Sequence, residues 1–230
     1  TKAIAEDLGF TVLHGIVDCL WVQGPHVEIL KQRVEQATGL HLEVEHFDWI
    51  VFEPMKDGFG AYNRYFGRMA DGSVKVRGIA ARRHDTPEYV RTMQQKMLEI
   101  MAGARTRAEL DDRWDEVAAI YRDAVERLPN APVQEMVIAR QISRAQYARR
   151  CIEGAAVEAC RRHGVAVAPG MKIRYVVTDA GRYRAEPVWC AATFDQQYYR
   201  NLLDAAWDEI RFAFGQGNRE GSVSGRILFN

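Results

Sequence analysis

The sequence lacks the features that mark several common classes of protein. Its four cysteines form no Cys-x-x-Cys pair, which argues against a zinc knuckle, and scattered single thiols fit a reducing compartment. No apolar run approaches the length of a membrane span, and no signal-peptide pattern follows Thr1. We therefore expect a cytoplasmic protein without a membrane partner. Thr1 in place of a start methionine suggests a piece of a longer chain.

An overall excess of positive charge is also missing, because the formal net charge is zero. The distribution is nevertheless uneven. Residues 60–84 carry six basic and one acidic side chain, and residues 139–184 carry ten basic and three acidic ones. Such blocks fit either solvated faces or a stripe that contacts phosphates. Charge alone favours solvated faces.

The first third of the chain reads as short strands with one helix. Its 47% hydrophobic content is ordinary for a globular protein, and 230 residues suffice for one large or two small domains. Strand-like runs flank His14-Gly15 and suggest a hairpin, and residues 40–53 alternate as a strand. Further expected elements are a helix over 26–38, strands over 62–67 and 73–79, and a turn at Asp71-Gly72.

After residue 86 the sequence pattern becomes mainly helical. Helical apolar spacing follows Pro87, and Asp195 is a good N-cap for a last helix through Ala213. The other expected elements are helices over 111–128 and 144–163 and strands over 136–142 and 172–178. The Gly- and Ser-rich stretch 216–230 is expected to be loose. The sequence therefore predicts an α+β fold with antiparallel strands and a helix before a boundary near 84–88, and mostly helices after it.

Four segments resemble, in order, parts of archaeal family B DNA polymerases. Leu8-Gly-Phe-Thr-Val-Leu-His-Gly-Ile-Val-Asp-Cys-Leu-Trp-Val22 is similar to the palm hairpin, which usually reads Tyr-Gly-Asp-Thr-Asp-Ser. Tyr62-Asn-Arg-Tyr-Phe-Gly67 and Lys75-Val-Arg-Gly-Ile-Ala-Ala-Arg-Arg-His-Asp85 are similar to the Lys-Lys-Arg-Tyr and Lys-x-x-Gly-x-x-x-x-Arg-Arg-Asp segments. Thumb signatures match at Pro169-Gly-Met-Lys-Ile-Arg-Tyr-Val-Val177 and Phe194-Asp-Gln-Gln-Tyr-Tyr199. The resemblance implies the C-terminal part of a palm over residues 1–86 and a thumb over 87–230.

The resemblance also implies a damaged catalytic site. Polymerases of this kind use two metal ions that clamp the attacking and leaving oxygens, and Mg²⁺ needs carboxylate ligands. By register, Ile16 replaces the first hairpin aspartate, whereas Asp18 keeps the second and is the expected catalytic residue and metal ligand. Glu45 is a second expected metal ligand. Because Ile16 offers no oxygen, Mg²⁺ binding is expected to be weakened, as in the inactivated archaeal branch.

The parts that hold DNA are better preserved. We expect binding of double-stranded primer–template DNA through its backbone, insensitive to sequence and dependent on salt. For each arginine the competing interpretation is a surface residue, and for Tyr65 it is strand packing. The expected DNA-binding residues are Asn63, Arg64, Tyr65, Lys75, Arg77, Gly78, Arg82, Arg83, Arg140, Arg144, Lys172 and Arg174.

Several alternatives stay open on the sequence. The family's upstream metal-binding strand and fingers helix precede this hairpin, so the chain alone is expected to be inactive and to need an upstream palm, fingers and exonuclease chain. The alternative is a non-catalytic DNA-binding or replication-regulatory protein derived from an inactivated polymerase. The tip Gly225–Asn230 lies where family members carry a sliding-clamp peptide, but it lacks the usual glutamine. A third, unrelated interpretation is a metal enzyme centred on His41, Glu43 and Glu45.

Overall fold

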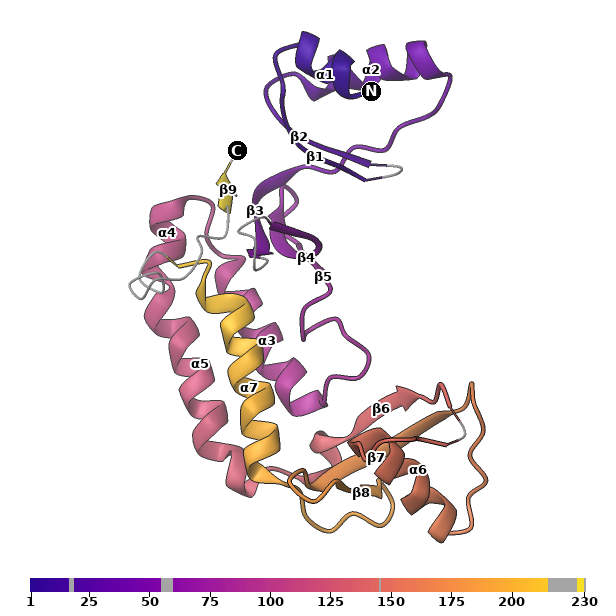
Figure 1. Ribbon diagram of the computed structural model, residues 1–230. Coiled ribbons are helices and arrows are strands. Elements are labelled where there is room, and N and C mark those ends of the chain that lie inside the picture. Colours follow the sequence, from indigo (N-terminus) through magenta and orange to yellow (C-terminus); the bar gives the residue numbers. More distant parts are fainter. Residues whose placement is uncertain (17–18, 55–59, 145, 215–226, 230) are drawn as a thin grey trace.

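The computed structural model describes residues 1–16, 19–54, 60–144, 146–214 and 227–229. The chain curves as an arc, with the N-terminal elements at one end and a small sheet at the other (Figure 1). Within these ranges, helices and three antiparallel sheets confirm the expected α+β class. No helix within the described ranges is long and apolar enough to cross a membrane.

The N-terminal end of the arc has its own small core. Its elements are α1 (Lys2–Asp7), β1 (Thr11–Ile16), β2 (Cys19–Gln23) and α2 (Val27–Thr38). Phe10, Leu30 and Val34 are buried together there. The expected hairpin is confirmed as the antiparallel pair β1–β2, but His14 and Gly15 lie inside β1, where they pair with Trp21 and Leu20. They stay in the strand because both ladder positions are filled.

The second sheet has the strand order β5-β4-β3-β9. Its strands are β3 (Phe47–Pro54), β4 (Gly60–Met69), β5 (Val74–Arg77) and β9 (Ile227–Phe229). The prediction of a strand over 40–46 is wrong. Phe47 pairs with Met69, and the Ala70 N–H donates to the His46 carbonyl at 2.9 Å. The chain then turns through Gly72 at φ +90°, so the partner strand ends beside residue 46. Residues 227–229, expected to be loose, pair instead with β3.

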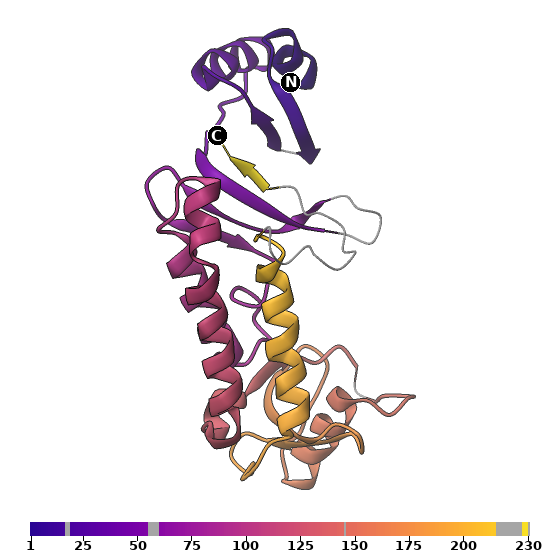
Figure 2. The same cartoon turned by 90° about the vertical axis from the view of Figure 1, so that its left-hand side faces the viewer.

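Three long helices pack on one another and run from this sheet toward the far end of the arc (Figure 1). They are α3 (Glu88–Met101), α5 (Trp114–Arg127) and α7 (Gln196–Arg211), with α4 (Arg107–Asp112) before α5. Figure 2 shows α5 and α7 side by side, where the Tyr121 ring stacks on Trp207 with centroids 5.2 Å apart. The single helix expected over 111–128 is wrong at its start. The Thr106 side chain caps α4, and Arg113 (ψ −5°) separates it from α5.

The far end of the arc is a sheet of order β6-β7-β8. Its elements are β6 (Ile138–Gln141), β7 (Lys172–Asp179), β8 (Arg184–Pro187) and α6 (Ile152–Arg162), preceded by the 3₁₀ turns η1 (Leu128–Asn130) and η2 (Val133–Met136). The helix expected over 144–163 begins only at Ile152. Cys151 is extended (φ −154°) and its Sγ accepts the Gly154 N–H, so it caps α6 rather than continuing a helix.

The largest core crosses the expected boundary at residue 86. It joins Trp49 and Phe66 of the second sheet to Met97 of α3 and Leu203 of α7. The Trp49 Nε1–H donates to the Ala104 carbonyl at 2.8 Å, which ties β3 to the chain after α3. The division into palm and thumb stays a prediction, and the two parts share one hydrophobic interior.

Candidate nucleic-acid interface

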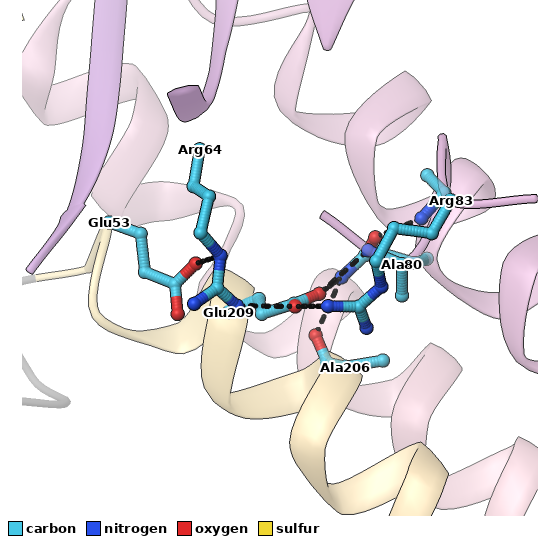
Figure 3. Close-up of polar contacts among 8 residues, drawn as sticks. Glu53, Arg64, Ala80, Arg83, Ala206 and Glu209 are labelled. Carbon is cyan, nitrogen blue, oxygen red and sulfur yellow. Dashed lines mark hydrogen bonds and ion pairs between the residues drawn. The ribbon is translucent and has the colours of Figure 1, made fainter. Parts of the chain in front are cut away.

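A buried carboxylate on α7 organises the centre of the arc. Glu209 is 5% exposed. Its Oε1 lies 3.3 Å from Nη2 of Arg64 on β4 and 3.0 Å from Nη1 of Arg83, and its Oε2 accepts the Ala80 N–H at 2.8 Å (Figure 3). Gln94 of α3 donates its Nε2–H to the same Oε2 at 2.8 Å. We call Glu209 with these four donors the Glu209 cluster. It fixes β4, α3 and the segment after β5 against α7.

The segment after β5 is further fixed by a glycine. Gly78 has φ +68°, a left-handed conformation that favours glycine. A Cβ atom at this position would lie 2.3 Å from the Asn63 carbonyl oxygen, so no larger residue fits without movement of the backbone. The Ala81 N–H then donates to the Gln94 side chain. Residues 78–83 therefore hold a defined path along the inner side of the arc (Figure 1).

Glu53 on β3 adjoins this cluster. Its carboxylate lies 2.8 Å from Nε of Arg64. Burial raises the pKa of the Glu53 carboxyl, the nearby Arg64 charge opposes the rise, and the Glu209 charge adds to it. Arg64 thus lies between two carboxylates, and this predicted DNA contact forms ion pairs within the protein.

The other predicted contacts of the first basic block divide into engaged and exposed side chains. Lys75 forms an ion pair with Glu45, and Arg83 belongs to the Glu209 cluster. Asn63, Arg77 and Arg82 are exposed. In the part of the chain that the structure describes, neither Arg77 nor Arg82 has an acidic partner. Two cations therefore project from a segment whose backbone is held in place, which is the arrangement that phosphate contacts need.

Tyr65 is buried rather than exposed. Its ring is 6% exposed and lies 5.2 Å from the Trp21 ring and 5.7 Å from the Phe52 ring, measured between centroids. The Tyr65 ring therefore packs against neighbouring rings, as the competing interpretation of this residue expected. These aromatic contacts join the N-terminal hairpin to β4, and the predicted role at a primer–template junction stays a prediction.

The predicted contacts of the second basic block do not share one face. Lys172 and Arg174 alternate with buried residues on β7 and are exposed. Arg140 pairs with Ile173, so its side chain lies on the opposite face of the sheet. Its guanidinium lies 3.4 Å from Glu153 and 3.8 Å from Asp85. Arg144 is exposed beyond β6. A single surface that includes all four is excluded by this register.

The structure describes only one of the two predicted magnesium ligands. Asp18 lies outside them, so its predicted role as a ligand is untested. Glu45 is engaged by Lys75, and His41 pairs with Glu35 at 3.0 Å. Within the described ranges, no group of three or more His, Cys, Asp or Glu side chains could hold a metal ion. The alternative of a metal centre at His41, Glu43 and Glu45 loses its basis, because residues 40–46 form no strand face.

The sequence analysis did not identify Glu209 and Gln94, the two buried polar residues at the centre of the Glu209 cluster. Both lie on the buried stripe of a helix, Glu209 three residues after Ala206 and Gln94 four residues after Val90. The sequence does contain one signal for them. Each is a polar residue at a position where the helical spacing predicts a buried apolar one, and a buried polar side chain needs hydrogen-bond partners.

Comparisons with known proteins agree with the resemblance seen in the sequence. No protein-family model matches the chain. "DNA polymerase 2" of Aeropyrum pernix is 31% identical over 235 residues, which cover 96% of this chain and 28% of that protein. "DNA polymerase 1" of Saccharolobus solfataricus is 25% identical over 92% of this chain and 24% of its own length. The chain is a homologue of archaeal DNA polymerases.

A solved structure supports the same polymerase family at the level of the fold. The family B DNA polymerase from the hyperthermophilic archaeon Pyrobaculum calidifontis aligns with a TM-score of 0.61 at 23% identity, over 91% of this chain and 28% of that one. The predicted resemblance is thereby confirmed in sequence for archaeal DNA polymerases and in fold for a family B polymerase. The chain spans less than a third of the polymerases it matches, so the activity of a whole polymerase is not assigned to it by likeness alone.

Proposed function

We propose that this chain is the palm-and-thumb portion of an archaeal family B DNA polymerase and binds primer–template duplex through its phosphates. In this proposal residues 1–86 complete the palm and residues 87–230 form the thumb. The observation that carries it is the Glu209 cluster, which holds residues 78–83 in place while Arg77 and Arg82 stay exposed. Fixed cations of this kind bind phosphates without reading the bases.

The remaining exposed cations extend the proposed contact. Asn63 beside this segment offers a neutral donor, and Lys172 and Arg174 on β7 add two charges at the far end of the arc. Arg64, Lys75 and Arg83 contribute by positioning, because each is paired with a carboxylate. The proposed binding therefore rests on a minority of the basic residues in the two blocks.

We infer that the chain does not extend a primer by itself. Ile16 occupies the position of one expected metal ligand, and Asp18 and Glu45 are the carboxylates left to hold Mg²⁺. Glu45 would have to release Lys75 to do so. An upstream chain with the remaining palm, fingers and exonuclease, and a sliding clamp at residues 225–230, stay predictions. Addition of Mg²⁺ and nucleotides to the chain on primer–template should leave the primer length unchanged.

A titration of labelled primer–template DNA tests the proposed binding. Fluorescence anisotropy should give an affinity that falls as salt rises, because each phosphate contact releases counterions. The double variant Arg77→Gln and Arg82→Gln should weaken binding and lower the slope of log K against log salt by about 2. The matched control is Arg122→Gln on α5, an exposed arginine outside the interface. Wild-type binding that ignores salt, or equal effects of the control, would refute the proposal.

A further inference from the structure

A groove with a volume of about 590 Å³ lies beside α6 and the β7–β8 hairpin, away from the Glu209 cluster. This volume is within the range of roughly 300–1,000 Å³ that small-ligand sites occupy. Its walls come from the chain before α6, from α6 itself and from β8. The charged residues that line it are Arg149, Arg150, Glu158, Arg162, Arg184 and Glu186. None of the arginines belongs to the set that the sequence assigned to duplex DNA.

The two acidic residues of the groove are already engaged. The Glu158 carboxylate accepts from Nη1 of Arg161 at 2.8 Å. Glu186 lies 3.4 Å from Nη2 of Arg162 and 3.5 Å from Nε2 of His163. Within the described part of the chain, Arg149, Arg150 and Arg184 have no acidic partner, and all three are exposed. The groove therefore presents a surplus of positive charge and suits an anion.

An aromatic ring stands at the rim of the groove in an uncommon backbone conformation. Tyr183 has φ +52°, a region that bulky side chains rarely adopt, and its side chain is 43% exposed. The turn holds it there through a hydrogen bond from the Tyr183 N–H to the Ala180 carbonyl at 3.1 Å. The Arg150 Cζ lies 5.8 Å from the ring centroid, and Arg150 Nη2 donates to the Arg182 carbonyl at 3.4 Å. Residues held in sparsely populated backbone conformations cluster at active sites and ligand-binding sites.

We propose that this groove binds a nucleotide unit with an unpaired base. The base stacks on the Tyr183 ring or on the Arg150 plane, and Arg149 and Arg184 contact its phosphate. A ring with an adjacent guanidinium is the platform on which single-stranded nucleic acids stack, and every base offers a face for it. Bases inside a duplex have no free face. The ligand is therefore a single-stranded nucleic acid or a free nucleotide, and not a duplex. This inference does not depend on the duplex binding proposed above.

The ring is tested with a variant that should fold at least as well as the wild type. Tyr183→Gly removes the aromatic group and also relieves the positive φ, so thermal unfolding should show no loss of stability. Binding of a labelled oligothymidylate of about eight nucleotides should weaken by about tenfold, the scale of one lost stacking contact. Tyr183→Phe keeps the ring and should bind like the wild type. Equal binding by wild type and Tyr183→Gly would overturn the proposal.

The phosphate contacts are tested by charge removal. Arg149→Gln and Arg184→Gln should each weaken oligothymidylate binding several-fold and reduce the salt slope by about 0.7, the value for single strands. Arg122→Gln on α5 is the matched control and should bind like the wild type. If the control weakens binding as much as the groove variants do, nonspecific attraction explains the binding and the proposal fails.

Competition identifies the source of the nucleotide. Displacement of the oligothymidylate by thymidine monophosphate would support a free nucleotide as ligand, and displacement only by unlabelled oligothymidylate would support a strand. A blunt hairpin duplex should compete weakly. If the duplex competes as well as the single strand, the groove recognises the nucleic-acid backbone alone and the stacking proposal is overturned.

Discussion

A carboxylate that leaves water loses its hydration, and Glu209 replaces that loss with two guanidinium groups, a side-chain amide and a backbone N–H. Glu209→Gln keeps an acceptor but removes the charge that both arginines face. We expect the free energy of unfolding to fall by about 2 kcal/mol, since hydrogen bonds to charged groups contribute about 1.5–3 kcal/mol. The partly exposed arginines hold the loss near the lower end of that range. Urea denaturation measures it.

The control for this variant is Glu99→Gln, an exposed glutamate on α3. Its stability should stay within about 0.5 kcal/mol of the wild type, as for most surface substitutions. If Glu209→Gln is equally neutral, the four contacts do not hold the segment in place, and the structural basis of the proposed interface is lost.

A comparison of Gly78 and Gly164 distinguishes the cost of backbone strain at positive φ from the cost of a steric clash. Both are left-handed (φ +68° and +78°), but a Cβ at Gly78 meets the Asn63 carbonyl at 2.3 Å, whereas Gly164 has no neighbour within 4 Å. Gly164→Ala should cost about 1–2 kcal/mol of backbone strain. Gly78→Ala should cost about 1–3 kcal/mol more, because the clash adds to the same strain. Equal unfolding free energies in urea would show that the β4 backbone yields.

Glu53 makes stability depend on pH in an unusual direction for a carboxylate. Burial raises its pKa above the ordinary value of 4.5, so the folded state binds the proton more tightly than the unfolded state does. Its contribution to stability therefore falls as pH rises from about 4.5 through the folded pKa. The variant Glu53→Gln should gain stability relative to the wild type across that window. Urea midpoints at several pH values would detect it.

Glu109 provides a control of opposite sign. The Arg105 N–H donates to its carboxylate at 2.7 Å and lowers its pKa. That contribution is present above the unfolded pKa and is lost as pH falls, so Glu109→Gln should lose stability relative to the wild type as pH rises. Parallel pH profiles for the two variants would contradict the assignment of Glu53.

At the scale of elements, the N-terminus of α7 depends on one side chain with two bonds. Asp195 Oδ1 accepts the Tyr198 N–H at 2.9 Å, and Oδ2 accepts the Ala180 N–H at 2.7 Å. Asp195→Ala should cost about 2 kcal/mol, the upper end for a lost cap, because the Ala180 amide loses its partner as well. Asp195→Asn keeps one acceptor oxygen, so its stability should lie between that of the wild type and that of Asp195→Ala. An alanine variant as stable as wild type in thermal unfolding would contradict this role.

The elements best predicted from sequence are those with a local signal. Residues 26–38 carry apolar residues at helical spacing, and this helix is confirmed within a residue. Asp195 is confirmed as the N-cap of the last helix, which ends at Arg211 rather than at Ala213. The strand expected over 40–46 failed because pairing depends on a partner, and β4 turns back at Met69. Strand β8, with the sequence Arg-Ala-Glu-Pro, has no strand propensity and exists only because β7 lies beside it.

The candidate site was predictable only in part, because its ion pairs also depend on residues that are distant in the sequence. Charge counts located the segment that carries Arg77 and Arg82. They gave no sign that Arg64, Lys75 and Arg83 pair with carboxylates, because the partners are distant in the sequence. Lys75 pairs with Glu45, 30 positions away, and Arg64 and Arg83 pair with Glu209, 145 and 126 positions away. The opposite faces of Arg140 and Arg174 follow from the register of β6 against β7, and no local pattern encodes that register.

At the scale of the whole molecule, the N-terminal core and the largest core among the described residues should open separately. The small core of α1, β1, β2 and α2 is distinct from the large one that joins the second sheet to α3 and α7. Less buried apolar area gives a lower opening free energy, so native-state hydrogen exchange should release the α2 amides before the α3 amides. Equal opening free energies in the two helices would show one cooperative unit.

The Glu209 cluster also has a mechanical consequence. A single side chain fastens β4, α3 and residues 78–83 to α7, so a force applied to α7 is shared by three neighbours at once. Sliding of α7 along its own axis would break all of these bonds together. We expect this part of the arc to move as one stiff lever, and bending to fall on the stretch at 39–46, which has no regular secondary structure.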